Sequence, residues 1–168
     1  AVRAGVDVRT GVTVASISNG TVAMTTGSAI EASAIVVATG VRERPRSARL
    51  VPGDRPAGVF TTGALQQFVQ RGLHVGERAV VVGAEHVSFS AIATLAHAGC
   101  RTVAMVTALP RHQSYAPLRW ATATRHRVPL LTGVDVANVL GHGRVESVEL
   151  TDGQLVACDT VVFTGDWV

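Results

Sequence analysis

The first third of the chain alternates between apolar and polar residues in short stretches separated by glycine turns. Asn19-Gly20 and Gly27-Ser28 are the turns, and Asn-Gly favours a tight hairpin because both of its positions adopt a positive φ. Alternation with a period of two is typical of half-buried antiparallel strands. The pattern therefore predicts a three-stranded meander, with strands over residues 12–17, 21–26 and 29–32.

A continuous apolar stretch follows this meander. Residues 34–39 read AIVVAT, which is typical of a strand buried on both faces of a parallel sheet, and Gly40 ends it. Residues 41–58 are rich in arginine and proline and lack periodicity, so they are predicted to connect two domains. Their arginines have no aromatic residues between them, which favours a solvated linker over a nucleic-acid-binding patch. These arginines are Arg42, Arg44, Arg46, Arg49 and Arg55.

The middle of the chain changes to a pattern of alternating strands and helices. Apolar residues recur at helical spacing between Ala84 and Ala98, and Gly99 follows as a stop signal. The stretch lies between two apolar runs, so it predicts a strand–helix–strand unit with a right-handed crossover. We predict helices over residues 64–70, 84–98 and 117–127, and strands over residues 79–82, 102–106 and 130–132.

The last third of the chain repeats the pattern of the first. Residues 133–165 can be laid over residues 11–40, because both begin with Gly-Val-x-Val-Ala and both close with an apolar strand that ends in Thr-Gly. We interpret this as a duplicated module that belongs to two similar domains. The chain does not begin with Met and enters strand-like sequence directly, so we expect a truncated chain that holds only the tail of the first domain.

The turn after the strand at residues 79–82 is a candidate phosphate-binding site. A helix that begins after such a turn offers free N–H groups and a dipole that favour an anion. Compared with the pattern G-x-G-x-x-G, the sequence reads Gly83, Ala84, Glu85, His86, Val87 and Ser88. Glu85 replaces the second glycine, where the backbone approaches a diphosphate, and its carboxylate would repel that group unless it points away. Binding of NAD(P) and a turn that has lost this function are both compatible with the sequence.

Thr107 follows the next predicted strand, near whose end an acidic residue would select an adenosine ribose. No carboxylate is present there, and Arg111 could accept a 2′-phosphate instead. A solvated loop arginine is the simpler interpretation of Arg111. After the apolar run at residues 34–39, the small residues of Ala38-Thr39-Gly40 would let the backbone approach a nucleotide closely.

Composition excludes several kinds of site. The formal net charge is +3, and all 15 basic residues are arginine, so a Schiff-base lysine and a Walker-type lysine are absent. Cys100 and Cys158 lie far apart and form no CxxC pair, which argues against a disulfide framework. We see no signal peptide and no apolar run of the ~20 residues that a membrane helix needs, and we expect a cytoplasmic protein. The histidines are too scattered to predict a metal site or a catalytic base; those considered are His86, His97, His112, His126 and His142.

Several segments resemble a known superfamily. The order of meander, IVVATG, arginine–proline connector, AVVVGA, helix, meander and VVFTG resembles the pyridine nucleotide–disulfide oxidoreductases. ATGVRERPR, VPGDRPAGVFTTGALQ, VVVGAEHVSFSAIATLAHAG and TVVFTGDWV resemble, more narrowly, the FAD-containing subunits grouped with hydrogen cyanide synthase, opine oxidase and the sarcosine oxidase α subunit.

The resemblance implies an α/β protein with a Rossmann-like nucleotide domain and a β-rich remnant of a second, FAD-binding domain. We expect the FAD-domain part at residues 1–45, a connector at 46–57 and an NAD(P)-type domain at 58–168. The implied function is that of an FAD-dependent oxidoreductase, which oxidises an amine or amino-acid-like substrate by hydride transfer to flavin. The resemblance also allows NAD(P) as a second cofactor. The implied partners are a small-molecule substrate and further subunits, with no nucleic acid and no membrane, and the fragment alone is expected to be inactive. In the alternative, the second domain is a scaffold or subunit-docking module that binds no NAD(P).

The resemblance also implies cofactor-binding residues. Ala38, Thr39 and Gly40 match the turn next to FAD, and Thr13 and Val14 match the strand that passes the adenine. Gly83 to Ser88 match the second dinucleotide turn, and Gly165 matches the end of that domain. The CxxC motif of the disulfide reductases has no counterpart, and no catalytic residue is identified.

Overall fold

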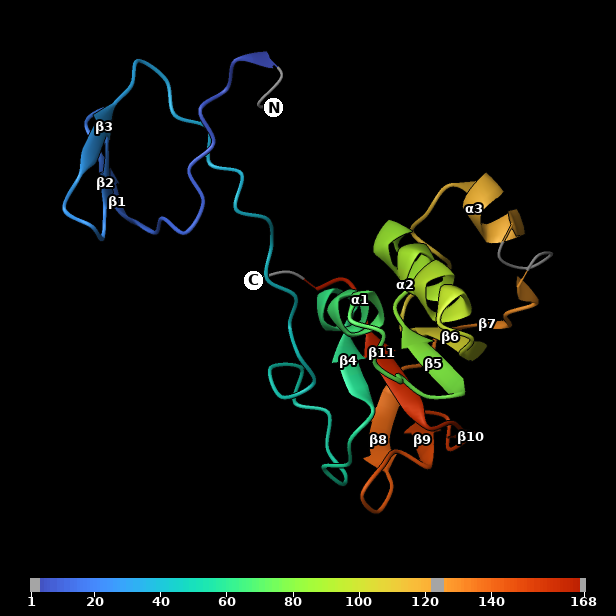
Figure 1. The fold of residues 1–168 in the computed structure, drawn as a ribbon. Helices are drawn as coiled ribbons and strands as arrows, with labels where there is room; N and C mark the ends of the chain where they lie inside the picture. The colour runs from blue at the N-terminus through green and yellow to red at the C-terminus, as the bar shows by residue number, and fades with distance from the viewer. Residues whose placement is uncertain (1–3, 122–125, 167–168) are drawn as a thin grey trace. The chain divides into compact units, whose positions relative to one another are not determined.

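The computed structural model describes residues 4–121 and 126–166, and the chain divides into two compact units, residues 1–40 and residues 41–168 (Figure 1). The first unit holds a three-stranded antiparallel sheet in the order β1-β2-β3. Asn19 and Gly20 connect β1 to β2 with φ values of 47° and 76°, as the hairpin signal requires. The predicted meander is confirmed, with bounds of Val14–Ser18 for β1, Thr21–Met24 for β2 and Ala29–Glu31 for β3.

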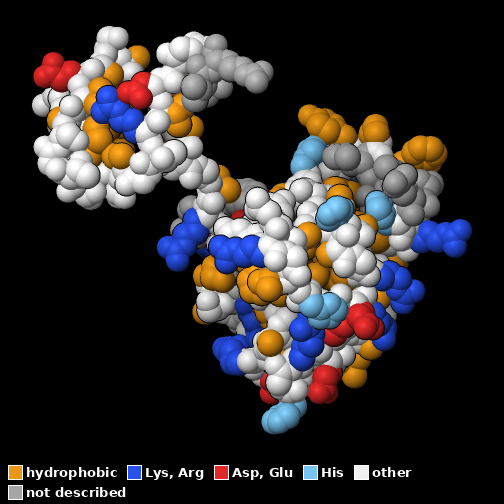
Figure 2. Space-filling view, viewed as in Figure 1, with side chains coloured by type: hydrophobic (Ala, Val, Ile, Leu, Met, Phe, Trp, Pro, Cys, Tyr) orange, Lys and Arg blue, Asp and Glu red, His pale blue; other side chains and the backbone are white. Residues whose placement is uncertain are grey.

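The strand predicted over residues 34–39 is wrong for this structure. These residues have no strand assignment, and Val36 and Val37 are 88% and 66% exposed. A strand that is buried on both faces needs a hydrogen-bonded neighbour and covering layers, and no described strand pairs with these residues. Figure 2 shows apolar side chains at the surface of this unit.

The second unit is built on a five-stranded parallel sheet in the order β4-β11-β5-β6-β7. Its strands are β4 (Val59–Thr61), β5 (Arg78–Val82), β6 (Arg101–Thr107), β7 (Leu130–Thr132) and β11 (Thr160–Phe163). The helices are α1 (Thr62–Gln70), α2 (His86–His97) and α3 (Ala116–Ala121). The predicted strand–helix–strand unit is confirmed as β5-α2-β6. The helix predicted over residues 117–127 corresponds to α3, and residues 122–125 lie outside the described residues.

Both faces of this sheet are covered, and the pleat of β5 shows how. Ala79 and Val81 belong to one apolar core with residues of α1 and α2, whereas Val80 and Val82 belong to a second core. That second core lies under the antiparallel sheet β10-β9-β8. Successive side chains of a strand point to opposite faces, so a continuous apolar run such as AVVV fills both cores. The antiparallel strands are β8 (Val136–Leu140), β9 (Ser147–Leu150) and β10 (Leu155–Ala157). The α/β class, with a parallel sheet and antiparallel meanders, is therefore confirmed.

The arginine–proline segment, residues 41–58, packs against the rest of the second unit and is not a solvated linker. Arg46 is buried, and its guanidinium donates to the carbonyl oxygens of Val51, Pro52 and Asp54. Two isolated bridges, Gly53 with Val139 and Ala57 with Arg144, join the segment to the meander. The solvated-linker interpretation rested on proline content, missing periodicity and the lack of aromatic residues, and it missed that a guanidinium can fold a loop by donating to its carbonyl groups.

Candidate functional site

The candidate site is the turn at the carboxyl end of β5, where the chain enters α2. Gly83 has a φ of 126° and donates its N–H to the carbonyl oxygen of Val106 at 2.7 Å. A Cβ on Gly83 would lie 2.1 Å from Thr164 Oγ1 and 2.7 Å from Glu85 Oε2. Both the backbone conformation and the close approach therefore require glycine, as expected for a nucleotide-type turn.

Glu85 is the N-cap residue of α2, and its carboxylate is tied into a network at the start of this helix. Ser88 Oγ accepts the N–H of Glu85 at 3.1 Å and donates to Glu85 Oε2 at 2.9 Å. Thr164 Oγ1 lies 2.6 Å from Ser88 Oγ and 2.9 Å from the carbonyl oxygen of Val82, to which it donates. The hydroxyl-bearing residues Ser88 and Thr164 are buried. The network thus joins the ends of β5 and β11 to the first turn of α2.

Gly165 supplies the remaining wall of this network. Its φ is 64°, and a Cβ there would lie 2.7 Å from the carboxyl carbon of Glu85. The space that Gly83 and Gly165 leave open is thus filled by a carboxylate of the chain itself. This negative group lies at the end of α2 where free N–H groups and the helix dipole attract an anion. In this arrangement the residues do not fit a bound diphosphate, because the Glu85 carboxylate occupies the space between Gly83 and Gly165.

The carboxyl edge of the parallel sheet also carries a polar cavity of about 160 Å³ beside this turn. Thr107, which is buried at the end of β6, lines the cavity together with Arg49 and Asp135. Arg49 Nη2 donates to the carbonyl oxygens of Thr164 at 3.0 Å and of Gly165 at 2.6 Å. Its guanidinium carbon also lies 5.5 Å from the centre of the Phe163 ring.

Sequence reasoning missed Thr164, Arg49 and Asp135 as residues of this edge. Thr164 had a signal, because its Thr-Gly pair repeats Thr39-Gly40. Arg49 had none, since it was one of several arginines in the predicted linker.

The other residues predicted for this turn lie around it. Ala84 is buried, and its carbonyl oxygen accepts the N–H of Gln113 from the loop after β6. His86 stacks edge-to-face on Tyr115 of the same loop, with ring centres 4.7 Å apart. Val87 is half-buried, and Arg111 is exposed on this loop. The structure therefore brings Gly83, Glu85, Ser88 and Gly165 into direct contact, and Arg111 does not join them.

The residues predicted to bind FAD lie in the first unit and form no enclosed site there. The carbonyl oxygen of Thr13 accepts the N–H of Thr25, and Val14 begins β1 half-exposed. Ala38, Thr39 and Gly40 are exposed, and a Cβ on Gly40 would meet nothing within 4 Å. The described residues of this unit therefore form no enclosed pocket in which the fit of a flavin nucleotide could be judged.

The described part of the chain has neither a candidate metal site nor a reactive thiol. No group of three or more His, Cys, Asp or Glu side chains could hold a metal ion among these residues. Burial, with a smaller contribution from Asp159, raises the pKa of Cys100 to about 12 and that of Cys158 to about 11. Both thiols are buried and free, so they are unreactive as nucleophiles near neutral pH. None of the described helices is long and apolar enough to cross a membrane.

A family model described as pyridine nucleotide-disulphide oxidoreductase matches residues 1–165. The chain belongs to this family. Its members are oxidoreductases that bind FAD, with NAD(P) as the usual second cofactor. No curated protein matches the chain significantly.

Solved structures with the same fold include reductases of several kinds. A ferredoxin reductase for the CYP199A2 system of Rhodopseudomonas palustris is 25% identical, with a TM-score of 0.68 over 94% of this chain and 41% of that one. The T. acidophilum thioredoxin reductase is 15% identical, with a TM-score of 0.70 over 94% and 53%. An NAD-dependent persulfide reductase from A. fulgidus is 18% identical, with a TM-score of 0.61 over 88% and 29%. The chain thus spans about half or less of the length of these proteins, and none of the three is an amine oxidase.

Proposed function

We propose that this chain is part of an FAD-dependent oxidoreductase in which the unit of residues 41–168 keeps the nucleotide-binding fold but does not bind NAD(P). The position of the Glu85 carboxylate carries this proposal. The Ser88 hydroxyl donates a hydrogen bond to this carboxylate at the N-terminus of α2, and the carboxylate fills the space between Gly83 and Gly165. In this role the unit serves as a scaffold or docking module, and residues 1–40 belong to the FAD-binding domain.

Electrostatics supports this loss of binding. Two unit charges ~4 Å apart interact by about 1 kcal/mol in water and about 4 kcal/mol near a protein surface. The larger value corresponds to roughly a thousandfold in affinity, which is enough to abolish ordinary micromolar binding. A diphosphate would have to displace the carboxylate and break its hydrogen bond with the Ser88 hydroxyl as well. We therefore expect the unit to reject both NADH and NADPH.

The substrate and partner assignments of the proposal come from the sequence. Resemblance of the segments around Gly40 and Gly83 to amine-oxidising subunits supports an amine or amino-acid-like substrate, which would give hydride from the carbon of its C–N bond to flavin. Further subunits would then carry electrons onward. A solved covalent putidaredoxin reductase–putidaredoxin complex shares the fold, with 21% identity and a TM-score of 0.58, and this supports the proposal of a protein partner. We also propose a cytoplasmic location, since both cysteines are free thiols.

A second candidate is an NAD(P)-linked reductase, which the ferredoxin, thioredoxin and persulfide reductases favour. It requires the Glu85 side chain to rotate away from the N-terminus of α2 when the cofactor binds. The two candidates predict different effects of removing this side chain: a gain of binding for the first and unchanged binding for the second.

Titration of NADH and NADPH into the purified chain by calorimetry tests the proposal. We expect no measurable binding to the wild type, and weak binding to Glu85→Gly, because glycine removes the charge and is well tolerated as an N-cap. Glu85→Gln separates charge from volume, and Glu77→Gln removes an exposed carboxylate elsewhere as a matched control. Micromolar binding to the wild type that Glu85→Gly leaves unchanged would overturn the proposal in favour of the reductase.

A further inference from the structure

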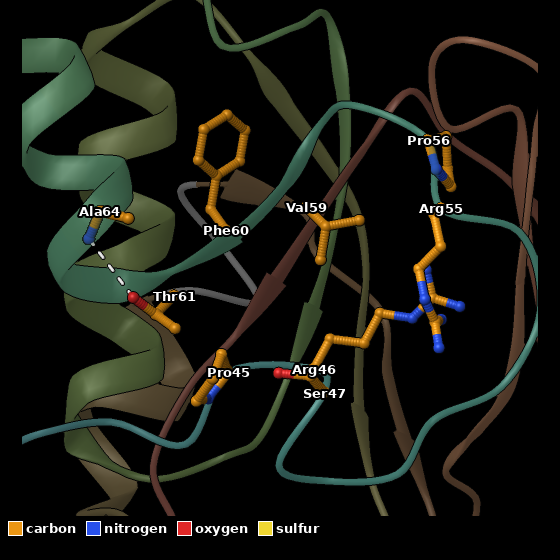
Figure 3. Close-up of a pocket in the computed structure, with 9 residues that line it drawn as sticks. All are labelled: Pro45, Arg46, Ser47, Arg55, Pro56, Val59, Phe60, Thr61 and Ala64. Carbon is orange, nitrogen blue, oxygen red and sulfur yellow. Dashed lines mark hydrogen bonds between the residues drawn. The ribbon is translucent and has the colours of Figure 1, made fainter.

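The second unit has a larger cavity that is separate from the β5–α2 turn. It has a volume of about 460 Å³ and opens beside β4, the edge strand of the parallel sheet (Figure 3). Val59 and Phe60 of β4 and the rings of Pro45 and Pro56 give it apolar walls. Small-molecule sites fall in this range of volume and typically combine apolar walls with a few polar groups.

Two arginines, Arg46 and Arg55, supply the charge of this cavity. Arg46 is held rigidly, because its Nε donates to the carbonyl oxygen of Val51 at 3.1 Å and its two terminal nitrogens donate to those of Pro52 and Asp54. A guanidinium has five N–H groups, so these bonds leave two of them for a ligand. Arg55 is exposed and makes one long contact of 3.5 Å with the carbonyl oxygen of Gly53.

In the described part of the chain, neither of these guanidinium groups forms an ion pair with a carboxylate. Asp54 is adjacent to Arg55 in the chain, and its Oδ2 accepts the N–H of Gly141 at 3.0 Å, whereas Glu43, three residues before Arg46, accepts the N–H of Gly63 through Oε2. Burial and the neighbouring charge of Arg55 lower the pKa of Arg46, and Asp54 only opposes this effect. Two like charges that face one cavity repel each other, and an anion between them would remove that repulsion.

We propose that this cavity binds a small organic carboxylate with an apolar body. The carboxylate lies between the fixed guanidinium of Arg46 and the exposed one of Arg55, since a planar guanidinium matches a carboxylate in two-point contacts. The apolar body packs against Val59, Phe60 and the two proline rings. The site lies at the β4 edge and uses none of the residues of the β5–α2 turn, so it is independent of whether the turn binds NAD(P).

Benzoate, benzamide and inorganic phosphate are suitable probes on the full chain, with binding followed by amide chemical shifts in NMR. We expect benzoate to shift the amide signals of Ser47, Arg55, Thr61 and Ala64, all of which line the cavity. Benzamide has the same shape without the charge, and phosphate has the charge without the apolar body. Each should bind at least about tenfold more weakly than benzoate, which is the size expected for loss of one charge-assisted contact or of most apolar burial.

Two variants test the residues. Arg55→Gln should weaken benzoate binding at least about tenfold without unfolding the chain, since this side chain is exposed. Arg71→Gln removes an exposed arginine outside the cavity and should leave binding unchanged. Equal binding of benzoate and benzamide, or an unaffected Arg55→Gln variant, would overturn the role of charge. Phosphate that binds as tightly as benzoate would overturn the role of the apolar walls, and shifts confined to other residues would overturn the site itself.

Discussion

The two meanders of this chain have similar sequences and different surroundings. β1-β2-β3 and β8-β9-β10 are both three-stranded antiparallel sheets, and the pairing of both first strands has a register shift. The irregularity falls between Val14 and Ser16 in one and between Val136 and Asn138 in the other, which are corresponding positions of the repeat. Register shifts at equivalent positions support the interpretation of a duplicated module. Local structure is therefore the same in both copies.

The apolar runs that come after the two meanders differ in structure. In the second copy the apolar run becomes β11, which is paired on both sides, by β4 and β5, and is fully buried. In the first copy the corresponding run at residues 34–39 is exposed and unpaired within the described chain. The hairpins form because their partners are adjacent in sequence, whereas a central parallel strand depends on strands from elsewhere. The comparison shows that an apolar run specifies a buried strand only together with its neighbours.

Substituting the same valine in both copies should give the largest difference. Val162 of β11 is fully buried, whereas Val37 occupies the corresponding position in the first copy and is exposed. We expect Val162→Ala to lower the free energy of unfolding of residues 41–168 by about 2–3 kcal/mol, through lost burial and a cavity. Val37→Ala should change the stability of residues 1–40 by less than about 0.5 kcal/mol. Residue-resolved amide hydrogen exchange reports each unit separately. Comparable losses in the two units would mean that residues 34–39 form a packed strand in solution.

The threonines of the two Thr-Gly pairs offer a smaller contrast. Thr164 Oγ1 is buried between the carbonyl oxygen of Val82 and Ser88 Oγ, whereas Thr39 is exposed. Thr164→Val should cost about 1–2 kcal/mol, because the buried hydrogen bond from the Thr164 hydroxyl to the carbonyl oxygen of Val82 is lost, and Thr39→Val should have almost no effect. Urea unfolding followed by helical circular dichroism measures the first variant, and hydrogen exchange measures the second. If Thr164→Val were neutral, the network around Glu85 would contribute little to holding β11 against α2.

The sequence predicted the elements of the fold well where the pattern was local. Hairpins, the β5-α2-β6 unit and the second meander all follow from periodicity and glycine positions, and the structure confirms each of them. The fate of residues 34–39 could not be predicted in this way, because it depends on pairing partners and not on the run itself. Arg46 illustrates the same limit: its charge suggested solvent, but three carbonyl groups of its own loop make burial favourable.

The position of the candidate site could be predicted from the sequence, but the orientation of the Glu85 carboxylate in it could not. Gly83 after a buried strand located the turn, and Glu85 raised the question of repulsion. The sequence could not show where the carboxylate points, because that depends on Ser88 and on Gly165, which lies far away in the chain. Close contact of Glu85 with both is a property of the tertiary structure.

The smallest predicted effect concerns Asp159, which precedes β11 and corresponds to Ala34 in the first copy. Its carboxylate accepts the backbone N–H groups of Glu77 and Arg78 at 2.9 to 3.1 Å, just before β5. Burial alone would raise the pKa of Asp159, but these hydrogen bonds outweigh it and the pKa is lowered. A lowered pKa means that the folded state binds the proton less readily than the unfolded state, so this stabilisation is present above an ordinary Asp pKa of about 4 and is lost as the pH falls further.

We expect Asp159→Asn to cost about 1 kcal/mol at neutral pH, a value reduced for solvent exposure, and less at acidic pH. Urea unfolding followed by helical circular dichroism at the two pH values checks this for Asp159→Asn. Ala34→Asp at the corresponding exposed position is the control, and hydrogen exchange follows it because α1, α2 and α3 all lie in the second unit. An Asp159→Asn penalty that is unchanged by acid would show that shape rather than charge fixes the start of β11.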